Sequence, residues 1–224
     1  MTSKMKIKEN DFIEIDYTGK DEQGRVFDTT VSQDAPDSYS KKALKPRIIC
    51  LGQRQLIKGL DEALVHKEIG SYKFTVEPDK AFGKKEAKHL KLMPMSLFKK
   101  QKIQPYKGLD VNIDGHIGTV RSVSGGRVIV DFNHPLAGQK VNYSVTVLRK
   151  VTDKKEQIES LLKILNIQAK KISVENENNK GTITLDKPLH PKLAQILKVQ
   201  IQDLIKVDVK IDAPEYKSSE EADK

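Results

Sequence analysis

The chain has 224 residues, more than the roughly 100–150 of a typical single domain, so two or three compact units are expected. Its residues are 37% hydrophobic, 5% aromatic and 32% charged, and its net charge is +9. No run approaches the roughly 18 apolar residues that a membrane helix needs, so the sequence excludes a helical membrane span and we expect no membrane partner.

The N-terminus and the cysteine content both indicate a cytoplasmic protein. Residues 1–11 carry several charged side chains and no apolar core, which is unlike a secretory signal. Cys50 is the only cysteine, so no internal disulfide can form and a reducing compartment is expected.

The positive charge is concentrated in the front of the chain. Residues 1–151 hold 27 Lys and Arg against 18 Asp and Glu, whereas residues 152–224 hold 13 of each. Residues 84–131 alone hold 10 basic and 4 acidic side chains. Such a surface attracts ribosomes, nucleic acid or acidic chains. Because stacking aromatics are missing, we favour a solvated lysine-rich face and expect no specific nucleic-acid site, although ribosome association stays possible.

The first 83 residues predict strands and one short helix. Alternating apolar residues predict a strand that begins near Asp11 and ends near residue 18, followed by short strands at 26–30 and 48–51. The pattern from Gly59, with acidic residues in its first turn, predicts a helix that Gly70 terminates. A further strand covers residues 72–76.

Residues 84–151 begin with a charged stretch and then return to strands. Residues 93–98 predict the start of a helix, with Pro94 near its first turn. Three short apolar segments separated by Asp-Gly and Gly-Gly turns then predict a small meander. The alternation from Val141 to Val147 predicts a long strand that ends near Val151.

Residues 152–224 predict a separate α+β unit. A helix with Thr152 or Asp153 as its cap precedes two strands joined near Asn179, and a second helix and a closing strand follow. Residues 218–224 are expected to be disordered. The balanced charge and separate apolar pattern of this unit predict that it folds independently of the rest.

Most catalytic chemistries lack a signature in this sequence. The five histidines show no metal-helix spacing, the lone Cys50 completes no zinc motif, and no glycine loop ends in Gly-Lys-Ser/Thr. We therefore expect no metal and no other cofactor. Cys50 lies in an apolar run, which favours a packed thiol over a nucleophile.

Four short segments carry a family resemblance, in the same order and spacing. They are Tyr17-Thr18-Gly19, the segment 24–30, the stretch 51–64 and Pro78-Asp79-Lys80-Ala81-Phe82-Gly83, the last of which looks like the start of a flap. The hexapeptide 133–138, about fifty residues later, is similar to the return of that flap. Together they resemble FKBP-type peptidyl-prolyl cis/trans isomerases of the SlyD-like group. Residues 6–151 are covered, and residues 152–224 make the chain look like the long archaeal members.

The resemblance implies an α+β fold in which an FKBP-like antiparallel sheet wraps on a short helix. It divides the chain into an isomerase domain (1–85 with 132–151), a small β-rich domain inserted in the flap (86–131) and a C-terminal α+β domain (152–224). It also implies isomerase activity. The implied catalytic residues are Tyr17, Asp28 and Phe82, and the implied substrate-binding residues are Phe27, Leu56, Ile57, Leu60, Leu136, Ala137 and Tyr143.

Two residues depart from the family pattern. Leu60 stands where drug-binding members usually have Trp, and Arg47 stands where they often have Phe, which predicts weak macrolide binding. Taken singly, Phe27, Leu56, Ile57 and Tyr143 could equally be plain core. Asp28 is a carboxylate within an apolar strand, so it should cap a turn or face a polar group such as Tyr17 or a substrate amide.

The insert is predicted to hold unfolded or partly folded proline-containing polypeptides. Its methionines and aromatic residues offer adaptable apolar surface, although they could instead form its small core. A non-catalytic holdase and a ribosome-associated binding protein remain the alternatives. The predicted holding residues are Met93, Met95, Leu97, Phe98, Ile103 and Tyr106.

Overall fold

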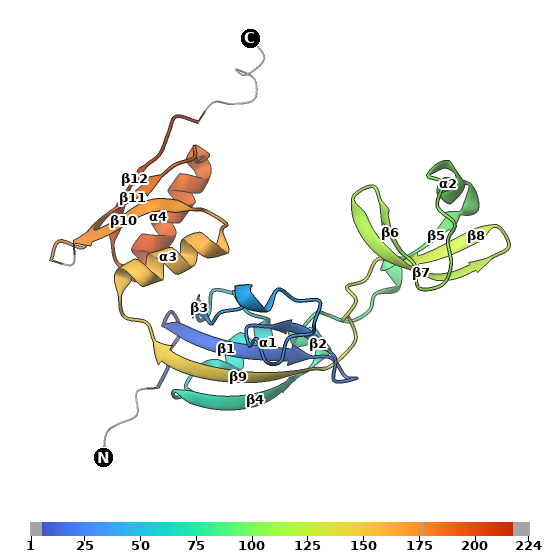
Figure 1. Ribbon diagram of the computed structural model, residues 1–224, viewed down its shortest axis with the longest axis horizontal. Coiled ribbons are helices and arrows are strands. Elements are labelled where there is room, and N and C mark those ends of the chain that lie inside the picture. Colours follow the sequence, from blue (N-terminus) through green and yellow to red (C-terminus); the bar gives the residue numbers. More distant parts are fainter. Residues whose placement is uncertain (1–5, 176, 217–224) are drawn as a thin grey trace, which may run out of the picture.

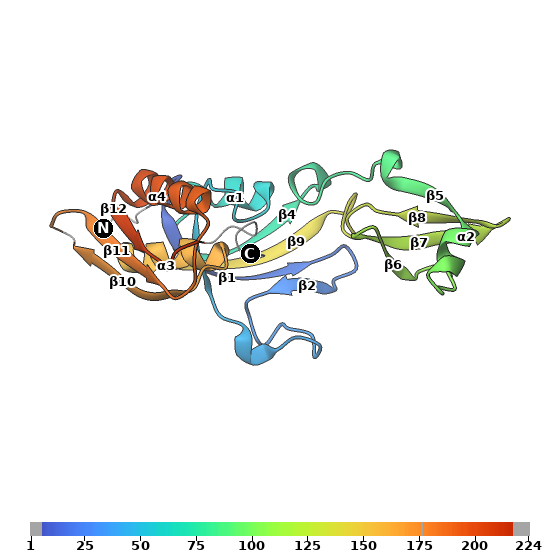
Figure 2. The same cartoon turned by 90° about the horizontal axis from the view of Figure 1, so that it is seen from above.

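The computed structural model describes residues 6–175 and 177–216. Three portions follow one another along an elongated molecule (Figure 1). A central sheet lies between an inserted small sheet at one end and a C-terminal α+β unit at the other. Figure 2 shows that the inserted sheet and the C-terminal unit lie at opposite ends of the long strands of the central sheet. Among the described residues, no helix is long and apolar enough to cross a membrane.

The central portion is a five-stranded antiparallel sheet with one short helix on its concave face. The strands run in the order β2-β1-β9-β4. Strand β2 pairs with residues 18–20 of β1, and β3 pairs with residues 12–15 of the same strand. Ile13 and Ile15 of β1 pack with Leu60 and Leu64 of the helix, and all four side chains are fully buried. The elements are β1 (Phe12–Lys20), β2 (Val26–Thr29), β3 (Arg47–Cys50), α1 (Lys58–Leu64), β4 (Gly70–Val76) and β9 (Val141–Lys150).

Helix α1 is shorter than its sequence pattern predicts. It ends at Leu64, and His66 adopts a left-handed φ of 66°, so the chain has already turned before Gly70 opens β4. Gly59 allows α1 to pack closely on β4, because a Cβ there would lie 2.5 Å from a methyl of Val76. A larger residue would push the helix off the sheet.

The inserted portion is a four-stranded sheet in the order β5-β8-β7-β6, with one face covered by a short helix. Its first strand, β5, lies where the sequence pattern predicts a charged stretch and then the start of a helix at residues 93–98. Residues 93 and 94 belong to this strand, and the helix begins only at Met95. Phe132 packs with the core of this portion, although the predicted boundary assigns it to the isomerase domain. The elements are β5 (Leu90–Pro94), α2 (Met95–Lys100), β6 (Asp110–Ile113), β7 (His116–Ser124) and β8 (Arg127–Asp131).

The C-terminal portion packs two helices on a three-stranded sheet. Asp153 caps the first helix by accepting a 2.8 Å hydrogen bond from the backbone N–H of Glu156, as one of the two predicted caps. The second helix crosses over so that the last strand pairs in parallel with β11. The elements are α3 (Lys154–Ile164), β10 (Ala169–Glu175), β11 (Lys180–Leu185), α4 (Pro191–Ile205) and β12 (Asp208–Asp212). The disorder predicted for 218–224 concerns residues outside the described ones.

The C-terminal portion shares a hydrophobic core with the central sheet, which argues against its predicted independence. Phe12, Cys50 and Val151 of the central portion are 2%, 0% and 1% exposed, and they belong to one buried cluster with Ile158 and Leu161 of α3. Helix α3 packs on β3. Without residues 152–224, these three apolar side chains would face water.

Candidate active site

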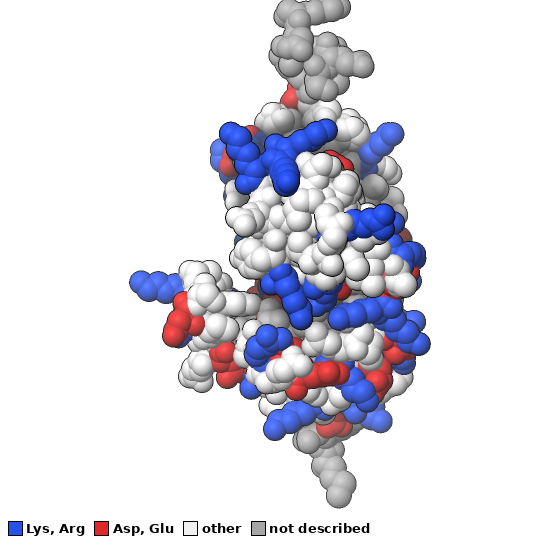
Figure 3. All heavy atoms as spheres, turned by 90° about the vertical axis from the view of Figure 1, so that its right-hand side faces the viewer, with Lys and Arg blue, Asp and Glu red and all other residues white. Residues whose placement is uncertain are grey.

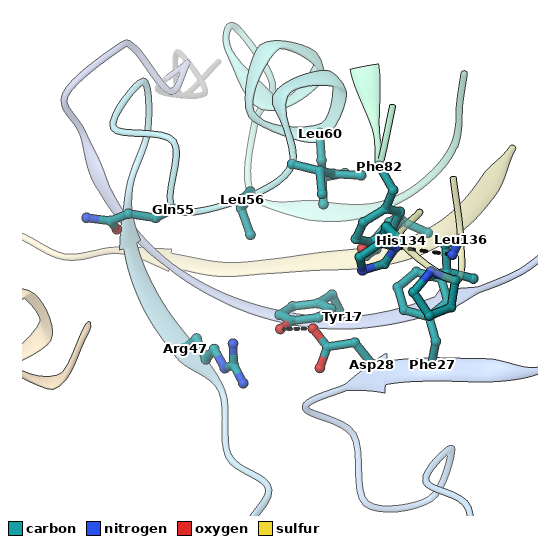
Figure 4. Close-up of a pocket in the computed structure, with 13 residues that line it drawn as sticks. Tyr17, Phe27, Asp28, Arg47, Gln55, Leu56, Leu60, Phe82, His134 and Leu136 are labelled. Atoms are coloured by element: carbon teal, nitrogen blue, oxygen red, sulfur yellow. Dashed lines mark hydrogen bonds between the residues drawn. The ribbon is translucent and has the colours of Figure 1, made fainter. Parts of the chain in front are cut away.

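A cleft of about 720 Å³ opens on the concave face of the central sheet, between β1, β2, α1 and the flap, which consists of residues 78–83 and 133–138 on either side of the insert (Figure 4). It gathers residues from seven separate segments of the chain. Most of the lining is apolar or aromatic, and the charged side chains are few. The lining residues are Tyr17, Phe27, Asp28, Arg47, Gln55, Leu56, Ile57, Leu60, Phe82, His134, Pro135, Leu136 and Tyr143.

Tyr17 and Asp28 form the polar pair of the cleft. The Tyr17 hydroxyl donates a 2.8 Å hydrogen bond to Oδ2 of Asp28, which joins β1 to β2. Burial, together with the neighbouring Asp28 carboxylate, raises the pKa of Tyr17 well above its usual value, so the hydroxyl keeps its proton. Asp28 therefore faces Tyr17, one of the two arrangements that its place in an apolar strand predicts.

Aromatic rings build one wall of the cleft. Phe27 meets Phe82 and Tyr143 edge-on, with ring centroids 5.6 Å and 5.7 Å away and interplanar angles of 84°. These are the edge-to-face contacts that aromatic pairs prefer. Gly19 lies beneath them, and a Cβ there would come within 2.8 Å of the Phe27 ring and 2.9 Å of the Tyr143 ring. Any larger residue in place of the glycine of the Tyr-Thr-Gly motif would thus collide with the rings of Phe27 and Tyr143.

The floor of the cleft comes from the loop before α1 and from the helix itself. Leu60 points from α1 into the cleft, and Leu56 and Ile57 precede it (Figure 4). The buried Asp61 fixes this loop, because its carboxylate accepts hydrogen bonds from the backbone N–H groups of Gly52 (3.0 Å) and Arg54 (3.4 Å). Because this loop is already fixed in one conformation, its apolar side chains lose little conformational entropy when a ligand binds.

The flap closes the opposite end. The ring of His134 stacks on Phe82 with centroids 4.5 Å apart and an interplanar angle of 5°. Its Nδ1 accepts a 3.1 Å hydrogen bond from the backbone N–H of Leu136, which holds the ring against the cleft. Ala137, by contrast, is 2% exposed and is not among the lining residues. Its predicted contact with substrate therefore stays a prediction that the cleft lining does not support.

Nine of the ten predicted isomerase-site residues line this one cleft, and four further lining residues lay outside the prediction. Arg47 and Gln55 come from β3 and the loop after it, and His134 and Pro135 come from the flap. The sequence offered a signal for three of them, since Arg47 was a visible departure from the family and the flap hexapeptide contains both His134 and Pro135. Gln55 lies in the resembling stretch 51–64 but carries no predicted role, and its side chain accepts a hydrogen bond from the backbone N–H of Cys50.

The predicted holding residues of the insert are mostly its core. Phe98 is fully buried, and Met93, Met95, Leu97 and Ile103 pack against it. A domain this small needs most of its apolar residues in its core. Tyr106 is the exception, with 63% of its side chain exposed. Other apolar residues of the insert lie on the surface: Leu90, Leu92, Ile117, Val123 and Ile129.

Two known families match the sequence. Residues 3–103 match the FKBP-type peptidyl-prolyl cis-trans isomerase family, and residues 91–136 match the family described as the IF domain of FKBP26. The chain is 28% identical to a short-type peptidyl-prolyl cis-trans isomerase of Methanocaldococcus jannaschii over 145 residues, which is 63% of this chain and 92% of that protein.

Two bacterial relatives give the same picture. The chain is 30% identical to the FKBP-type isomerase SlyD of Aeromonas hydrophila over 146 residues, or 64% of each chain. It is 34% identical to the FKBP-type 16 kDa isomerase of Escherichia coli over 110 residues, which is 46% of this chain and 73% of that protein. These identities, the family match and the residues of the cleft agree, and the chain belongs to the FKBP-type peptidyl-prolyl cis-trans isomerases.

Proposed function

We propose that this isomerase holds unfolded or partly folded proline-containing chains on its insert and rotates their X-Pro bonds in the cleft. The observation that carries the catalytic part is the composition of the cleft, in which aromatic and aliphatic walls surround a single hydroxyl-carboxylate pair, Tyr17 and Asp28. Such a cavity fits a prolyl ring and one amide.

The chemistry needs no nucleophile. An X-Pro bond rotates over a barrier of about 18–20 kcal/mol because the planar amide is resonance-stabilised. At the half-rotated point this resonance is lost and the amide is less polar, so an apolar cleft disfavours the planar form more than the twisted one. On this proposal Phe27, Phe82 and Tyr143 hold the ring, and Tyr17 and Asp28 orient the neighbouring polar groups.

Support for the holding role comes from one face of the inserted sheet. Leu92 of β5 and Ile129 of β8 are paired directly across the two strands, and their side chains are 58% and 36% exposed. Leu90 is two residues from Leu92 along β5, so its side chain lies on the same face, 44% exposed. This outer face, defined by Leu90, Leu92 and Ile129, lies opposite the buried residues under α2.

The charge distribution around the insert fits the same role. Figure 3 views the molecule from the end that carries the insert, and the insert presents a broad uncharged area with Lys and Arg side chains around its border. An uncharged surface with a basic border binds apolar segments of many sequences and keeps the free protein soluble.

Replacing residues 87–132 with a short glycine-containing turn tests the division of labour. The ends can be joined because the backbone N–H of Gly138 donates a 2.8 Å hydrogen bond to the carbonyl of Gly83, which brings the two sides of the flap together. We expect tetrapeptide isomerisation to persist, while catalysis of proline-limited refolding and suppression of aggregation fall strongly. Equal loss on peptide and protein substrates would refute the holding role.

A point-mutant pair locates the surface without removing the domain. Leu92→Ser combined with Ile129→Ser should reduce suppression of aggregation and leave tetrapeptide activity in place. Ile69→Ser is the matched control, because Ile69 is 58% exposed like Leu92 but lies in the central portion, just before β4. If the control lowers suppression as much as the double variant does, the outer face has no special part in holding chains.

A further inference from the structure

Arg47 places a cation in the wall of a largely apolar cleft. It opens β3, where its backbone pairs with that of Ile15 in β1, and its guanidinium carbon lies 5.7 Å from the centroid of the Tyr17 ring. A guanidinium over the face of an aromatic ring is held there by the ring quadrupole. Figure 4 shows Arg47 and Asp28 on the same side of the cleft, next to the Tyr17 hydroxyl, with Phe82 and His134 farther along.

Within the described residues, the Arg47 side chain has neither a hydrogen-bond acceptor nor a carboxylate at ion-pair distance. Arg121 and Arg149, in contrast, both bond carboxylates, at 2.8 Å from Asp131 and 2.6 Å from Glu14. The nearby carboxylate of Asp28 already accepts the hydrogen bond of the Tyr17 hydroxyl. Arg47 thus presents exposed, unused donors beside the place where a prolyl ring would bind.

We infer that Arg47 is a specificity-determining residue that favours substrates with an acidic side chain directly before or after the proline. A Glu or Asp next to the ring meets Arg47 at the rim, whereas Lys or Arg meets a like charge. Asp28 is bonded to Tyr17 and only partly exposed, whereas Arg47 is exposed, so a flanking substrate side chain in solvent reaches the guanidinium more readily than the carboxylate. The inference rests on isomerase activity in this cleft and not on the holding role of the insert.

The size of the effect follows from the exposure of the pair. An exposed ion pair changes a binding constant by roughly twofold to fivefold, so kcat/KM for an acidic peptide should exceed that for a basic one by about that factor at each responsive position. The contact involves a flanking side chain and not the rotating bond, so it should appear mainly in KM. Salt at about 1 M should remove it, because the Debye length falls to roughly 3 Å.

The test uses the full-length protein and two tetrapeptide series, one with Glu, Gln or Lys before the proline and one with the same residues after it. Each kcat/KM is divided by that of the Gln peptide of its series. For wild type we expect a Glu-to-Lys ratio of about three or more in at least one series. Arg47→Met should bring the ratio near one, and Arg47→Glu should invert it.

Lys73→Glu is the matched control. It makes the same change in net charge as Arg47→Glu but lies on the solvent side of β4, where alternate residues Tyr72 and Phe74 face the core. Its ratio should stay within twofold of wild type. The inference is overturned if the wild-type ratio is near one in both series, if Arg47→Met slows all peptides equally without changing the ratio, or if Lys73→Glu inverts it. Turnover of the Gln peptides by wild type reports the isomerase activity itself, so failure of that activity is distinguishable from failure of the selectivity.

Discussion

The side-chain amide of Asn133 is paired in both directions with the backbone of Glu86. Its Oδ1 accepts a 2.9 Å hydrogen bond from the Glu86 N–H, and its Nδ2 donates a 3.2 Å bond to the Glu86 carbonyl. The same Nδ2 also donates, at 2.7 Å, to the buried Asp131 at the end of β8. The two chain segments that lead into and out of the insert are thereby tied together at one residue.

Asn133→Ala should loosen the insert with little effect on the cleft. Three hydrogen bonds are lost, one of them to the buried Asp131 carboxylate, so we expect a stability loss of about 2–4 kcal/mol and faster hydrogen exchange of the Glu86 amide. Spin labels on Lys73→Cys and Lys107→Cys should report a wider distance distribution. The native Cys50 will not interfere, because burial first, and then the nearby Asp61 and Asp11 carboxylates, raise the pKa of its thiol to about 12.

The control for this experiment is Asn112→Ala, an exposed amide in β6 of the same insert. It should leave both the exchange rate at Glu86 and the distance distribution unchanged. An unaltered distribution in Asn133→Ala would mean that the junction is fixed by the backbone alone, through contacts such as the 3.0 Å bond from the Phe132 N–H to the His89 carbonyl.

The hydrogen bond between Tyr17 and Asp28 predicts a non-additive pair of variants. Tyr17→Phe and Asp28→Ala should each lower kcat/KM for a tetrapeptide by about tenfold or more, because each removes the bond between the Tyr17 hydroxyl and the Asp28 carboxylate, and a bond to a charged acceptor is worth about 1.5–3 kcal/mol. The double variant should be close to either single one, since both remove the same contact. Thermal unfolding checks that all three proteins remain folded. Additive losses near a hundredfold would show that the two groups act separately.

Much of the cleft could be predicted from the sequence because its residues sit in short, ordered motifs. Phe27 with Asp28, and Leu56 with Ile57, are fixed relative to each other by the strand and loop that carry them. What a linear motif does not encode is which of its members turns inward. Ala137 and Leu136 are neighbours in the same hexapeptide, yet only Leu136 reaches the cleft.

The packing of the insert and of the C-terminal unit could be predicted less well than the cleft, for different reasons. In the insert, composition correctly indicated abundant apolar residues, but only packing decides that Phe98 is core while Leu92 is surface. In the C-terminal unit, charge balance and apolar periodicity indicate which residues pack against one another inside the unit. They do not show which surface of the unit packs against the central sheet, so the cluster that joins Phe12 to α3 was not predictable.

The raised pKa values of Tyr17 and Tyr143 predict two tyrosines that resist ionisation. Burial is the main cause for both, with Asp28 adding to it. In difference titrations at 295 nm, wild type minus Tyr17→Phe or minus Tyr143→Phe should show no phenolate signal near pH 10 in the folded protein. In urea the same difference should titrate near pH 10. A folded-state signal at pH 10 would contradict the buried hydroxyls.

The sign of the linked stability follows from the same values. A tyrosine whose folded pKa is raised favours the neutral form, so its contribution is fully present below the unfolded pKa of about 10 and is lost as the pH rises toward the folded value. The free energy of unfolding of wild type should therefore fall relative to that of Tyr17→Phe only above about pH 10.

The shared core predicts that damage to the C-terminal unit lowers the stability of the isomerase portion. Leu161 of α3 is 2% exposed and belongs to the cluster that contains Phe12 and Val151, so Leu161→Ala should cost about 2–5 kcal/mol. The matched control is Leu165→Ala, just beyond the same helix, because Leu165 is 38% exposed and its truncation should cost about 1 kcal/mol or less.

The decisive measurement is the temperature at which tetrapeptide activity is lost, since only the central portion carries the cleft. With a common core, Leu161→Ala should lower that temperature together with the melting of helical signal, and a chain ending at residue 151 should be poorly soluble or inactive because Phe12, Cys50 and Val151 become exposed. The ion pairs from Arg149 to Glu14 and Glu156 are exposed and would add little. If activity in Leu161→Ala melts at the wild-type temperature while helical signal is lost earlier, the two portions unfold separately and the cluster does not couple them.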